Sequence, residues 1–257
     1  MKNVLITGAG RGLGKHLGEF LSKKGYFVYG TTRNLQAVED TDRFRFLYLD
    51  LKDRESIDQL YNHLITLNES IDVLIHNSGV AYLDPADLLD EEERRHKFEV
   101  NFFGPIRLTE KILPMMRKAN QGNIIFISSI VSIDHWPYLG IYAASKAAIE
   151  SVAFEWAVLL KKWNIHVSVI RPNPLPTDMQ ILRSKNTKNS SYPDLQERSL
   201  NWENIDDVCS IVSLILNNPS PYFAYQTGPF SEEIAQRFLN KDAYQMAVEK
   251  YQSDLKL

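Results

Sequence analysis

The fold is decided by Thr7-Gly8-Ala9-Gly10-Arg11-Gly12-Leu13-Gly14, which holds four of the 12 glycines of the chain at every second position. The apolar run Val4-Leu5-Ile6 precedes these glycines, and a segment with helical spacing of apolar residues begins at Gly12. Glycine lets a backbone turn tightly and approach a pyrophosphate, while a helix N-terminus offers unpaired N–H donors. The stretch therefore predicts a strand, a phosphate cradle and a helix; a plain tight turn is the less favoured interpretation.

Outward from this stretch, short apolar runs alternate with longer segments of helical spacing. Most runs are continuously apolar, as in parallel strands that are covered on both faces. The alternation predicts one Rossmann-like α/β domain over residues 1–257, with a doubly wound parallel sheet and helices on both faces. The expected strands are 4–6, 27–29, 44–49, 71–75, 123–127 and 166–170, and the expected helices are 12–24, 53–67, 91–118 and 142–163.

The composition is that of an ordinary globular protein. Charged residues make up 24% of the chain and the formal net charge is −3, which excludes a strongly basic nucleic-acid binder. No uncharged apolar run is long enough to span a membrane, and residues 1–6 do not read as a signal peptide. The one cysteine, Cys209, is expected to be a small buried hydrophobe, and the six histidines have no metal-ligand spacing. We therefore expect a cytoplasmic protein without a metal, a nucleic-acid partner or a membrane partner.

The glycine stretch resembles the Thr-Gly-x-x-x-Gly-x-Gly motif of the short-chain dehydrogenase/reductase superfamily, in its short branch. The similarity continues motif by motif over about residues 3–228. It implies a nicotinamide cofactor bound at Gly8, Arg11, Gly12, Leu13 and Gly14. The segment His76-Asn77-Ser78-Gly79 stands where the family has Asn-Asn-Ala-Gly. Asn77 and Gly79 are kept, and the resemblance implies that they line the cofactor ribose and brace the sheet.

The end of the second expected strand indicates which nicotinamide cofactor is bound. An NAD-binding fold usually has a carboxylate here, which bonds the ribose hydroxyls and would repel a 2′-phosphate. This chain has Thr32 and Arg33 instead, and Arg11 is a second cation near the same place. A guanidinium can hold a phosphate through two hydrogen bonds, so these residues favour NADP(H) over NAD(H). Two solvated surface arginines are the alternative.

Two further segments are matched to the cofactor through the resemblance. Asp50-Leu51 resembles the pair that holds the adenine, although Asp50 is equally suited to cap the helix expected near residue 53. Pro172-Asn173 stands where the family has Pro-Gly, and Thr177 matches a threonine that contacts the cofactor. Asparagine tolerates a positive φ better than other non-glycine residues, so the turn at Asn173 can be kept.

Tyr142 and Lys146 lie four residues apart in an expected helix, so they share one helical face. A neighbouring ammonium favours the phenolate and lowers a tyrosine pKa from its usual value near 10. Ser129 lies 13 residues before Tyr142, after an expected strand, at the edge where such sheets bind ligands. The resemblance implies that Ser129 orients the substrate oxygen and Tyr142 exchanges its proton. It also implies that Lys146 lowers the pKa of Tyr142 and holds the nicotinamide ribose.

Asn101 completes this tetrad. Asparagine is intrinsically poor in the middle of a helix, and in the family the matching residue perturbs the helix and holds a water that links the lysine to solvent. The resemblance implies an NADP(H)-dependent oxidoreductase that interconverts a carbonyl and a secondary alcohol. A non-catalytic NADP-binding sensor is an alternative that the complete tetrad disfavours. A family member with a non-redox reaction is another, and nothing in the sequence separates it from a reductase.

The sequence also indicates where a substrate and a second subunit would bind. Residues 178–203 are expected to form a lid, with His135, Trp136 and Tyr138 near its mouth for an apolar carbonyl, although aromatic residues are more often core. Residues 229–257 are expected to form a divergent helical tail with Ser231 as N-cap. This tail puts the family tetramer in doubt. A homodimer is expected through helices 91–118 and 142–163, with apolar contacts from Trp156, Leu159 and Leu160.

Overall fold

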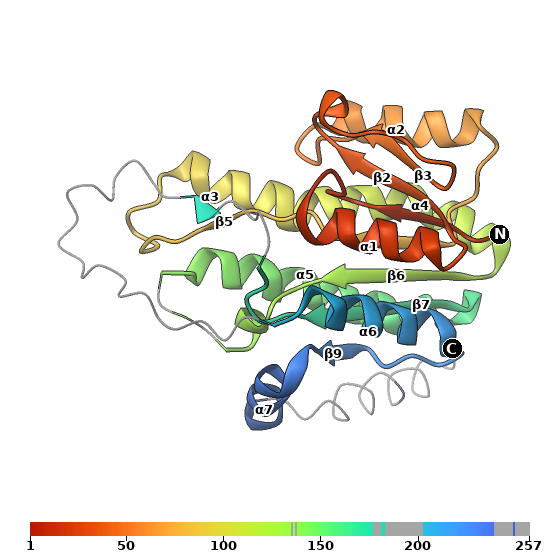
Figure 1. Ribbon diagram of the computed structural model, residues 1–257. Coiled ribbons are helices and arrows are strands. Elements are labelled where there is room, and N and C mark those ends of the chain that lie inside the picture. The colour runs from red at the N-terminus through yellow and green to blue at the C-terminus, as the bar shows by residue number, and fades with distance from the viewer. Residues whose placement is uncertain (135, 137, 177–180, 183–202, 239–248, 250–257) are drawn as a thin grey trace.

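A parallel sheet forms the centre of the molecule in this computed structural model, which describes residues 1–134, 136, 138–176, 181–182, 203–238 and 249 (Figure 1). The sheet has seven strands in the order β3-β2-β1-β4-β6-β7-β9, and all of its pairings are parallel. The predicted α/β class, a Rossmann-like doubly wound sheet, is confirmed. The strands are β1 (Asn3–Ile6), β2 (Phe27–Thr32), β3 (Phe44–Tyr48), β4 (Val73–His76), β6 (Gly122–Ile127), β7 (Ile165–Arg171) and β9 (Ala224–Gln226).

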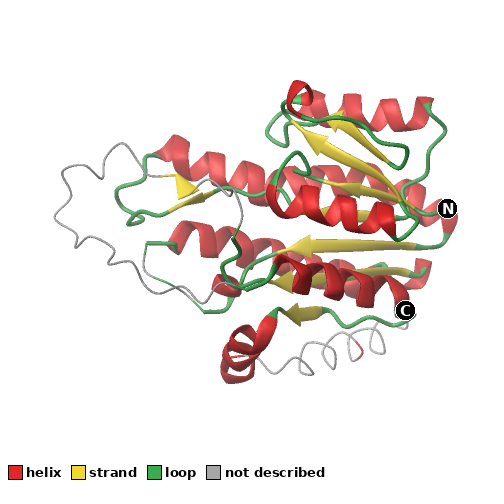
Figure 2. Cartoon of the chain, in the orientation of Figure 1, coloured by secondary structure: helices red, strands yellow, loops and turns green. Residues whose placement is uncertain are grey.

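Helices pack on both faces of this sheet, as Figure 2 shows by their red colour on either side of the yellow strands. On one face, α1 (Gly12–Lys23) and α6 (Ile205–Asn217) pack against the strands through a core that includes Leu17 and Val212. On the other face lie α2 (Arg54–Thr66), α4 (Gly104–Ala119) and α5 (Gly140–Leu159). Each face therefore buries its own apolar core against the same strands.

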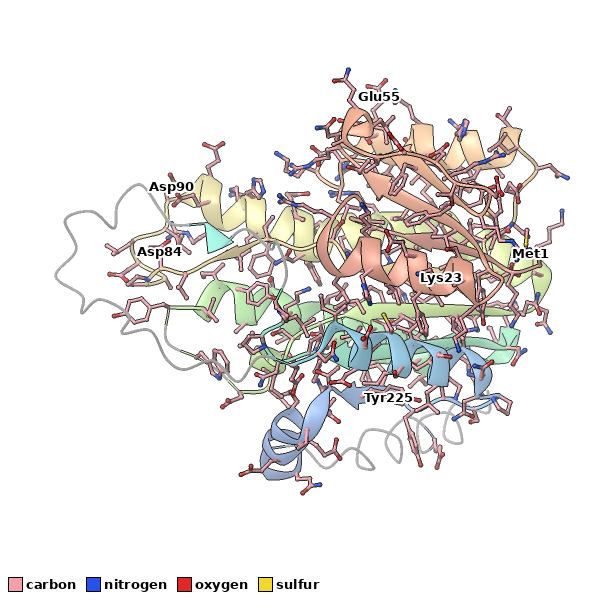
Figure 3. The ribbon with its side chains drawn as sticks, in the orientation of Figure 1. Met1, Lys23, Glu55, Asp84, Asp90 and Tyr225 are labelled. Carbon is pink, nitrogen blue, oxygen red and sulfur yellow. The ribbon has the colours of Figure 1, made fainter. Side chains whose placement is uncertain are left out.

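The expected helix over 91–118 is three elements. A regular helix, α3 (Glu91–Phe98), is followed by a π-helical segment (Glu99–Phe103) and then by α4. Pro105 at the start of α4 has no N–H to give to an i−4 carbonyl, so the ladder must be rebuilt around it. Asp90 begins α3 by accepting a hydrogen bond from the Glu93 N–H, and it lies at that helix end in Figure 3.

The smaller elements come from sequence-distant segments. Strand β5 (Ala81–Tyr82) pairs in parallel with β8 (Ile181–Leu182), and short 3₁₀ turns lie at Leu35–Ala37, Ile130–Ser132 and Lys161–Trp163. Most of the expected lid 178–203 lies outside the described residues. The expected tail 229–257 is described as far as α7 (Gly228–Phe238) and at residue 249. Because α7 begins at Gly228, Ser231 is not its N-cap as predicted; its Oγ donates to Glu203 Oε1 instead (2.9 Å).

The proposed dimer face is not as apolar as the sequence suggested. Leu160 is 1% exposed and packs in the core, whereas Trp156 is half-buried and stacks on Phe126, and Leu159 is exposed. Leu160 therefore does not offer the contact that we expected of it. The homodimer itself stays a prediction. No helix within the described ranges is long and apolar enough to cross a membrane.

Candidate active site

The candidate site lies at the carboxyl edge of the sheet. The strand order reverses direction between β1 and β4, and open α/β sheets bind ligands outside the carboxyl ends of the strands at such a switch point. Gly8 follows β1, Asn77 follows β4, and Ser129 follows β6 shortly after its last residue. The topology therefore brings the predicted cofactor and catalytic residues to one edge.

The glycine turn packs closely against its neighbours, and it leads into a helix N-terminus that can bind an anion. Gly8 has a φ of +68°, and a Cβ there would lie 2.6 Å from Ser78 Oγ. A Cβ on Gly14 would lie 2.5 Å from Asn77 Nδ2. The first turn of α1 has no capping side chain and no acidic residue, so its N–H groups remain for an anionic ligand. These residues fit the pyrophosphate of a dinucleotide.

Asn77 braces this turn as the resemblance implied. Its Nδ2 donates to the carbonyl oxygens of Thr7 and Gly8, both at 3.0 Å. Thr7 Oγ1 in turn accepts from the backbone N–H groups of Asn77 and Ser78. The ends of β1 and β4 are thereby tied together beneath the glycines. Gly79 lies deeper, where a Cβ would be 3.5 Å from Lys146 Nζ.

The end of β2 lies against the same turn. Thr32 Oγ1 would be 2.7 Å from a Cβ on Gly10, so Thr32 is placed beside the glycines, and Arg33 and Arg11 are both exposed. The sequence analysis did not place two further side chains here, those of His96 and Lys52. Burial and the charges of Lys52 and Arg33 lower the pKa of His96, whereas Asp50 raises it, so these groups share one neighbourhood. The neighbourhood of His96 therefore holds the cations Arg33 and Lys52 together with the acids Asp50 and Glu92.

Asp50 and Leu51 follow β3, and Asp50 is not the helix cap. Asp53 caps α2 by accepting from the Glu55 N–H (2.9 Å), whereas Asp50 Oδ1 accepts from the Lys52 N–H (3.0 Å). The capping alternative for Asp50 is therefore wrong. Leu51 is 4% exposed and packs in the core.

The four predicted catalytic residues come together. Tyr142 and Lys146 lie on α5 and are buried, and the Ser129 side chain lies close enough to Tyr142 to lower its pKa. Lys146 Nζ donates to the Ile127 carbonyl (2.8 Å) at the end of β6 and lies 5.8 Å from the Tyr142 ring centroid. Asn101 sits in the π-helical segment, 2% exposed.

Asn101 is held by a complete set of hydrogen bonds. Its Oδ1 accepts from the Val80 N–H, and its Nδ2 donates to the Val80 carbonyl and to Ser145 Oγ, at 2.9, 2.9 and 3.0 Å. The perturbed helix that the resemblance implied is therefore present as the π-helical segment. Asn101 reaches the loop after β4 on one side and the residue next to Lys146 on the other.

The pKa of Tyr142 moves opposite to the prediction. Burial raises it to about 12, and the neighbouring Ser129 side chain acts in the opposite direction. Burial also lowers the pKa of Lys146 to about 8, against the charge of Glu150. The sequence motif pairs the phenol with the ammonium but does not show how deeply the two side chains are buried. Here burial has the larger effect on the pKa of Tyr142.

The segment after β7 differs from its expectation in one respect. Asn173 does not have the positive φ that we assigned to it; its N–H instead donates to Glu203 Oε2 (3.1 Å). Pro172 is buried, and its carbonyl accepts from the Ile130 N–H (2.9 Å), which joins this turn to the segment after Ser129. Thr177 lies outside the described residues.

An apolar group surrounds Tyr142 on the side away from the sheet. It consists of buried residues from β5, the turn after Ser129 and α5, with three partly buried residues packed against them. Trp136, which was expected near the substrate mouth, belongs to this group, and its Nε1 donates to Asp134 Oδ2 (2.8 Å). The group is Ala81, Ile130, Val131, Tyr142 and Ala143 with Ile133, Trp136 and Leu139.

One set of possible metal ligands lies elsewhere, between α1 and α6. Ligand atoms of His16, Asp206 and Cys209 lie within 4.8 Å of one another, the only such set in the described part of the chain. His16 Nε2 is 2.8 Å from Asp206 Oδ1, and burial, with the Asp206 charge, raises the pKa of Cys209 to about 12. A protonated thiol beside a hydrogen-bonded His–Asp pair accounts for the contact, and the prediction of no metal stays a prediction.

Comparisons with known proteins agree with this geometry. The family model described as short chain dehydrogenase matches residues 2–188, which is more than half of the chain. The chain therefore belongs to the short-chain dehydrogenase family, a family of oxidoreductases.

Individual relatives narrow the comparison. A 3-ketodihydrosphingosine reductase of Bacteroides thetaiotaomicron is 36% identical over 77% of this chain and 74% of its own length. An NADPH-dependent 3-dehydrocapnine reductase of Ornithobacterium rhinotracheale is 30% identical over 70% of this chain and 67% of its own. The solved structure of a short-chain dehydrogenase from Streptomyces avermitilis superposes with a TM-score of 0.84, at 25% identity, over 99% of this chain and 97% of that one.

Proposed function

We propose that this protein is an NADPH-dependent reductase that converts a carbonyl group to a secondary alcohol, with Asn101, Ser129, Tyr142 and Lys146 as its catalytic residues. The observation that carries the proposal is that Ser129 and the Lys146 ammonium lie beside Tyr142, at the carboxyl edge of the sheet. The cofactor, when bound, supplies the hydride.

Each residue then has one task. Ser129 donates a hydrogen bond to the substrate oxygen and holds it next to the Tyr142 hydroxyl. Tyr142, with its pKa at about 12, is protonated at neutral pH and gives its proton to the oxygen as the carbon is reduced. Lys146 holds the nicotinamide ribose with its ammonium and lies against Gly79. Asn101 fixes the loop beside Lys146, and we assign to it the water that returns a proton from solvent.

Cofactor preference follows from charge at the end of β2. Arg33 and Arg11 are exposed cations at the glycine turn, and Thr32 offers a hydroxyl where an NAD-specific fold has a carboxylate. Gly8, Gly12, Leu13 and Gly14 would cradle the pyrophosphate, Asp50 and Leu51 the adenine, and Asn77 and Gly79 the nicotinamide ribose. Pro172 and Thr177 would contact the nicotinamide end. We infer NADP(H) over NAD(H), and one of the relatives is itself named as NADPH-dependent.

The substrate class is inferred from the apolar group and from the relatives. Ala81, Ile130, Val131 and Leu139 pack with Tyr142 in one apolar cluster, so apolar side chains surround the catalytic phenol that we propose. Two relatives are named for keto substrates, 3-ketodihydrosphingosine and 3-dehydrocapnine. We therefore propose the 3-keto form of a long-chain sphingoid-type base as the first substrate to test.

The remaining expectations stand as parts of this proposal. We propose one domain over residues 1–257 with residues 178–203 as substrate lid, a cytoplasmic location, a homodimer, and no partnership with nucleic acid or membrane. A non-catalytic NADP-binding sensor is the alternative that the following experiment tests.

The test compares wild type with Tyr142→Phe in NADPH consumption with 3-ketodihydrosphingosine. We expect the variant to bind NADPH within about twofold of wild type but to lose at least about a hundredfold in kcat, since it has no proton to give. Tyr225→Phe is the matched control, because Tyr225 lies on β9 and its hydroxyl bonds only the Tyr222 backbone among the contacts described (Figure 3). Full turnover by Tyr142→Phe would refute the assignment. NADPH binding without reduction of any ketone would favour the sensor.

A further inference from the structure

A buried ion pair lies one helical turn beyond Lys146. Glu150 follows Tyr142 and Lys146 at intervals of four on α5, so the three side chains share one helical face. The side chains of Glu150 and Arg171, at the end of β7, are 7% and 1% exposed, and Arg171 Nη2 donates to Glu150 Oε2 (2.7 Å). A buried ion pair of this kind does not by itself stabilise a fold, since desolvation offsets the attraction.

The same carboxylate holds the segment that carries Ser129. Glu150 Oε1 accepts from Ser128 Oγ (2.5 Å) and from Ser132 Oγ (2.6 Å), the residues that bracket the turn beginning at Ser129. Arg171 Nε also donates to Oε1 (3.1 Å), which gives this oxygen three donors. Ser129 on its turn and Tyr142 on its helix are thus joined through one acid.

We propose that Glu150 is a positioning residue of the catalytic centre. Its carboxylate fixes the Ser129 turn against α5, and its negative charge favours the protonated form of Lys146. The inference rests on the proposed function. Ser128, the residue before Ser129, is one of the two serines through which Glu150 holds this turn.

The charges around Lys146 come from several elements. His76 of β4 is neutral, because burial and the Lys146 charge lower its pKa to about 3, and Tyr142 is neutral as well. Asn101 and the Ile127 carbonyl are uncharged. Glu150 opposes the burial that lowers the pKa of Lys146, and Arg171 lies beyond Glu150. Removing the Glu150 charge therefore lets the ammonium lose its proton at a lower pH.

The test separates charge from fold with two variants. Glu150→Gln keeps an acceptor for the serines but removes the carboxylate charge that opposes the buried Arg171 guanidinium, so it loses stability. Glu150→Gln/Arg171→Met removes both charges and should regain most of that stability. In both, we expect the alkaline limb of kcat for ketone reduction to move down by about one pH unit, since an opposite charge at close range shifts a pKa by that order. An alkaline limb that returns to the wild-type position in the double variant would reduce Glu150 to a structural residue and overturn the proposal.

A second readout does not depend on activity. The Lys146 Cε resonance of ¹³C-lysine-labelled protein, assigned by its loss in Lys146→Arg, should titrate near pH 8 in wild type and lower in Glu150→Gln. If wild type reduces no ketone and the resonance still shifts, the proposed function fails and the Glu150 charge effect stands. If wild type is active and neither the resonance nor the limb moves, the Glu150 inference fails.

The hydrogen bonds from Ser128 and Ser132 to Glu150 are tested separately. Ser128→Ala and Ser132→Ala should each lower kcat several-fold with little change in the Kd of NADPH, since they loosen the Ser129 turn and not the cofactor cradle. Ser168→Ala is the matched control, because Ser168 is equally buried but bonds the Tyr222 carbonyl on another part of the sheet. If Ser128→Ala and Ser132→Ala are as active as Ser168→Ala, their hydrogen bonds to Glu150 do not position Ser129.

Discussion

A protonated phenol and an ammonium close to its pKa stand together at the catalytic centre. The pKa of Tyr142 is about 12 and that of Lys146 about 8. At pH 7 Tyr142 holds its proton and Lys146 its charge, which is the state that reduction of a carbonyl requires. Oxidation of an alcohol needs Tyr142 to accept a proton as phenolate, and the burial of Tyr142 disfavours that form. Reduction at neutral pH can therefore use the protonation states that both residues already have.

Arg33 is the residue on which the cofactor preference is tested. Arg33→Ala removes an exposed guanidinium at the end of β2 and should weaken NADPH binding by about tenfold or more, the value of one charge-assisted contact. NADH lacks the 2′-phosphate, so its Kd should change by less than about threefold. Nicotinamide fluorescence titrations of both cofactors measure the difference.

Arg43→Ala is the control for that variant. Arg43 is also exposed, but it precedes β3 at the amino ends of the strands, away from the carboxyl edge. Its carbonyl accepts there from the Val28 N–H. Its loss removes the same charge without touching the cofactor edge. Equal weakening of NADPH by the two variants, or equal affinity of wild type for NADPH and NADH, would contradict the phosphate assignment.

Single residues were predictable where a motif ties them to one local element. Ser129, Tyr142 and Lys146 follow from a strand end and one helix, and their neighbours in the chain fix their places. Glu150 was missed because it belongs to no motif. A signal existed, since Glu150 continues the spacing of Tyr142 and Lys146 along the helix, and its partner Arg171 ends an apolar strand.

At the scale of elements, the packing of α1 on the sheet can be tested without touching the site. A Cβ on Gly18, in the middle of α1, would lie 2.5 Å from Phe44 Cε1 of β3. Gly18→Ala should therefore destabilise the protein by about 1–3 kcal/mol, as overpacking of a core does. Gly140→Ala in α5 is the control, because no atom lies within 4 Å of its added methyl group. Denaturant midpoints measure both, and a neutral Gly18→Ala would contradict the close contact of α1 with β3.

Elements were predictable where local pattern and packing agree. The six strands and the start of α1 follow from apolar runs and glycines. Helix α6 was missed, because Ile205, Val208, Ile211 and Val212 are β-branched and weak helix formers, and packing on the sheet decides their state. Asn204, which accepts from the Asp206 N–H, was the available start signal. The π-helical segment was signalled by Pro105, while the β5–β8 pairing is too short and too distant in sequence to predict.

At the scale of the whole molecule, the two apolar cores lie on opposite faces of one sheet, so they share its strands. Leu5, Leu74 and Ile124 point into one core, and the residues beside them, Ile6, Val73 and Ile125, point into the other. The two faces cannot unfold separately without exposing the common strands, which makes the described part of the chain a single cooperative unit.

We therefore expect one thermal transition, observed alike in near-ultraviolet and far-ultraviolet circular dichroism. NADPH at about a hundred times its Kd should add about 2.7 kcal/mol to the free energy of unfolding. For a protein of this size that raises the midpoint by about 5–10 °C. The same concentration of NADH should raise it less, and Arg33→Ala should lose most of the NADPH effect while Arg43→Ala keeps it. Two separated transitions would contradict the single domain, and a midpoint that ignores NADPH would contradict the cofactor site, because a ligand bound to the glycine turn and both strand ends must stabilise the sheet they belong to.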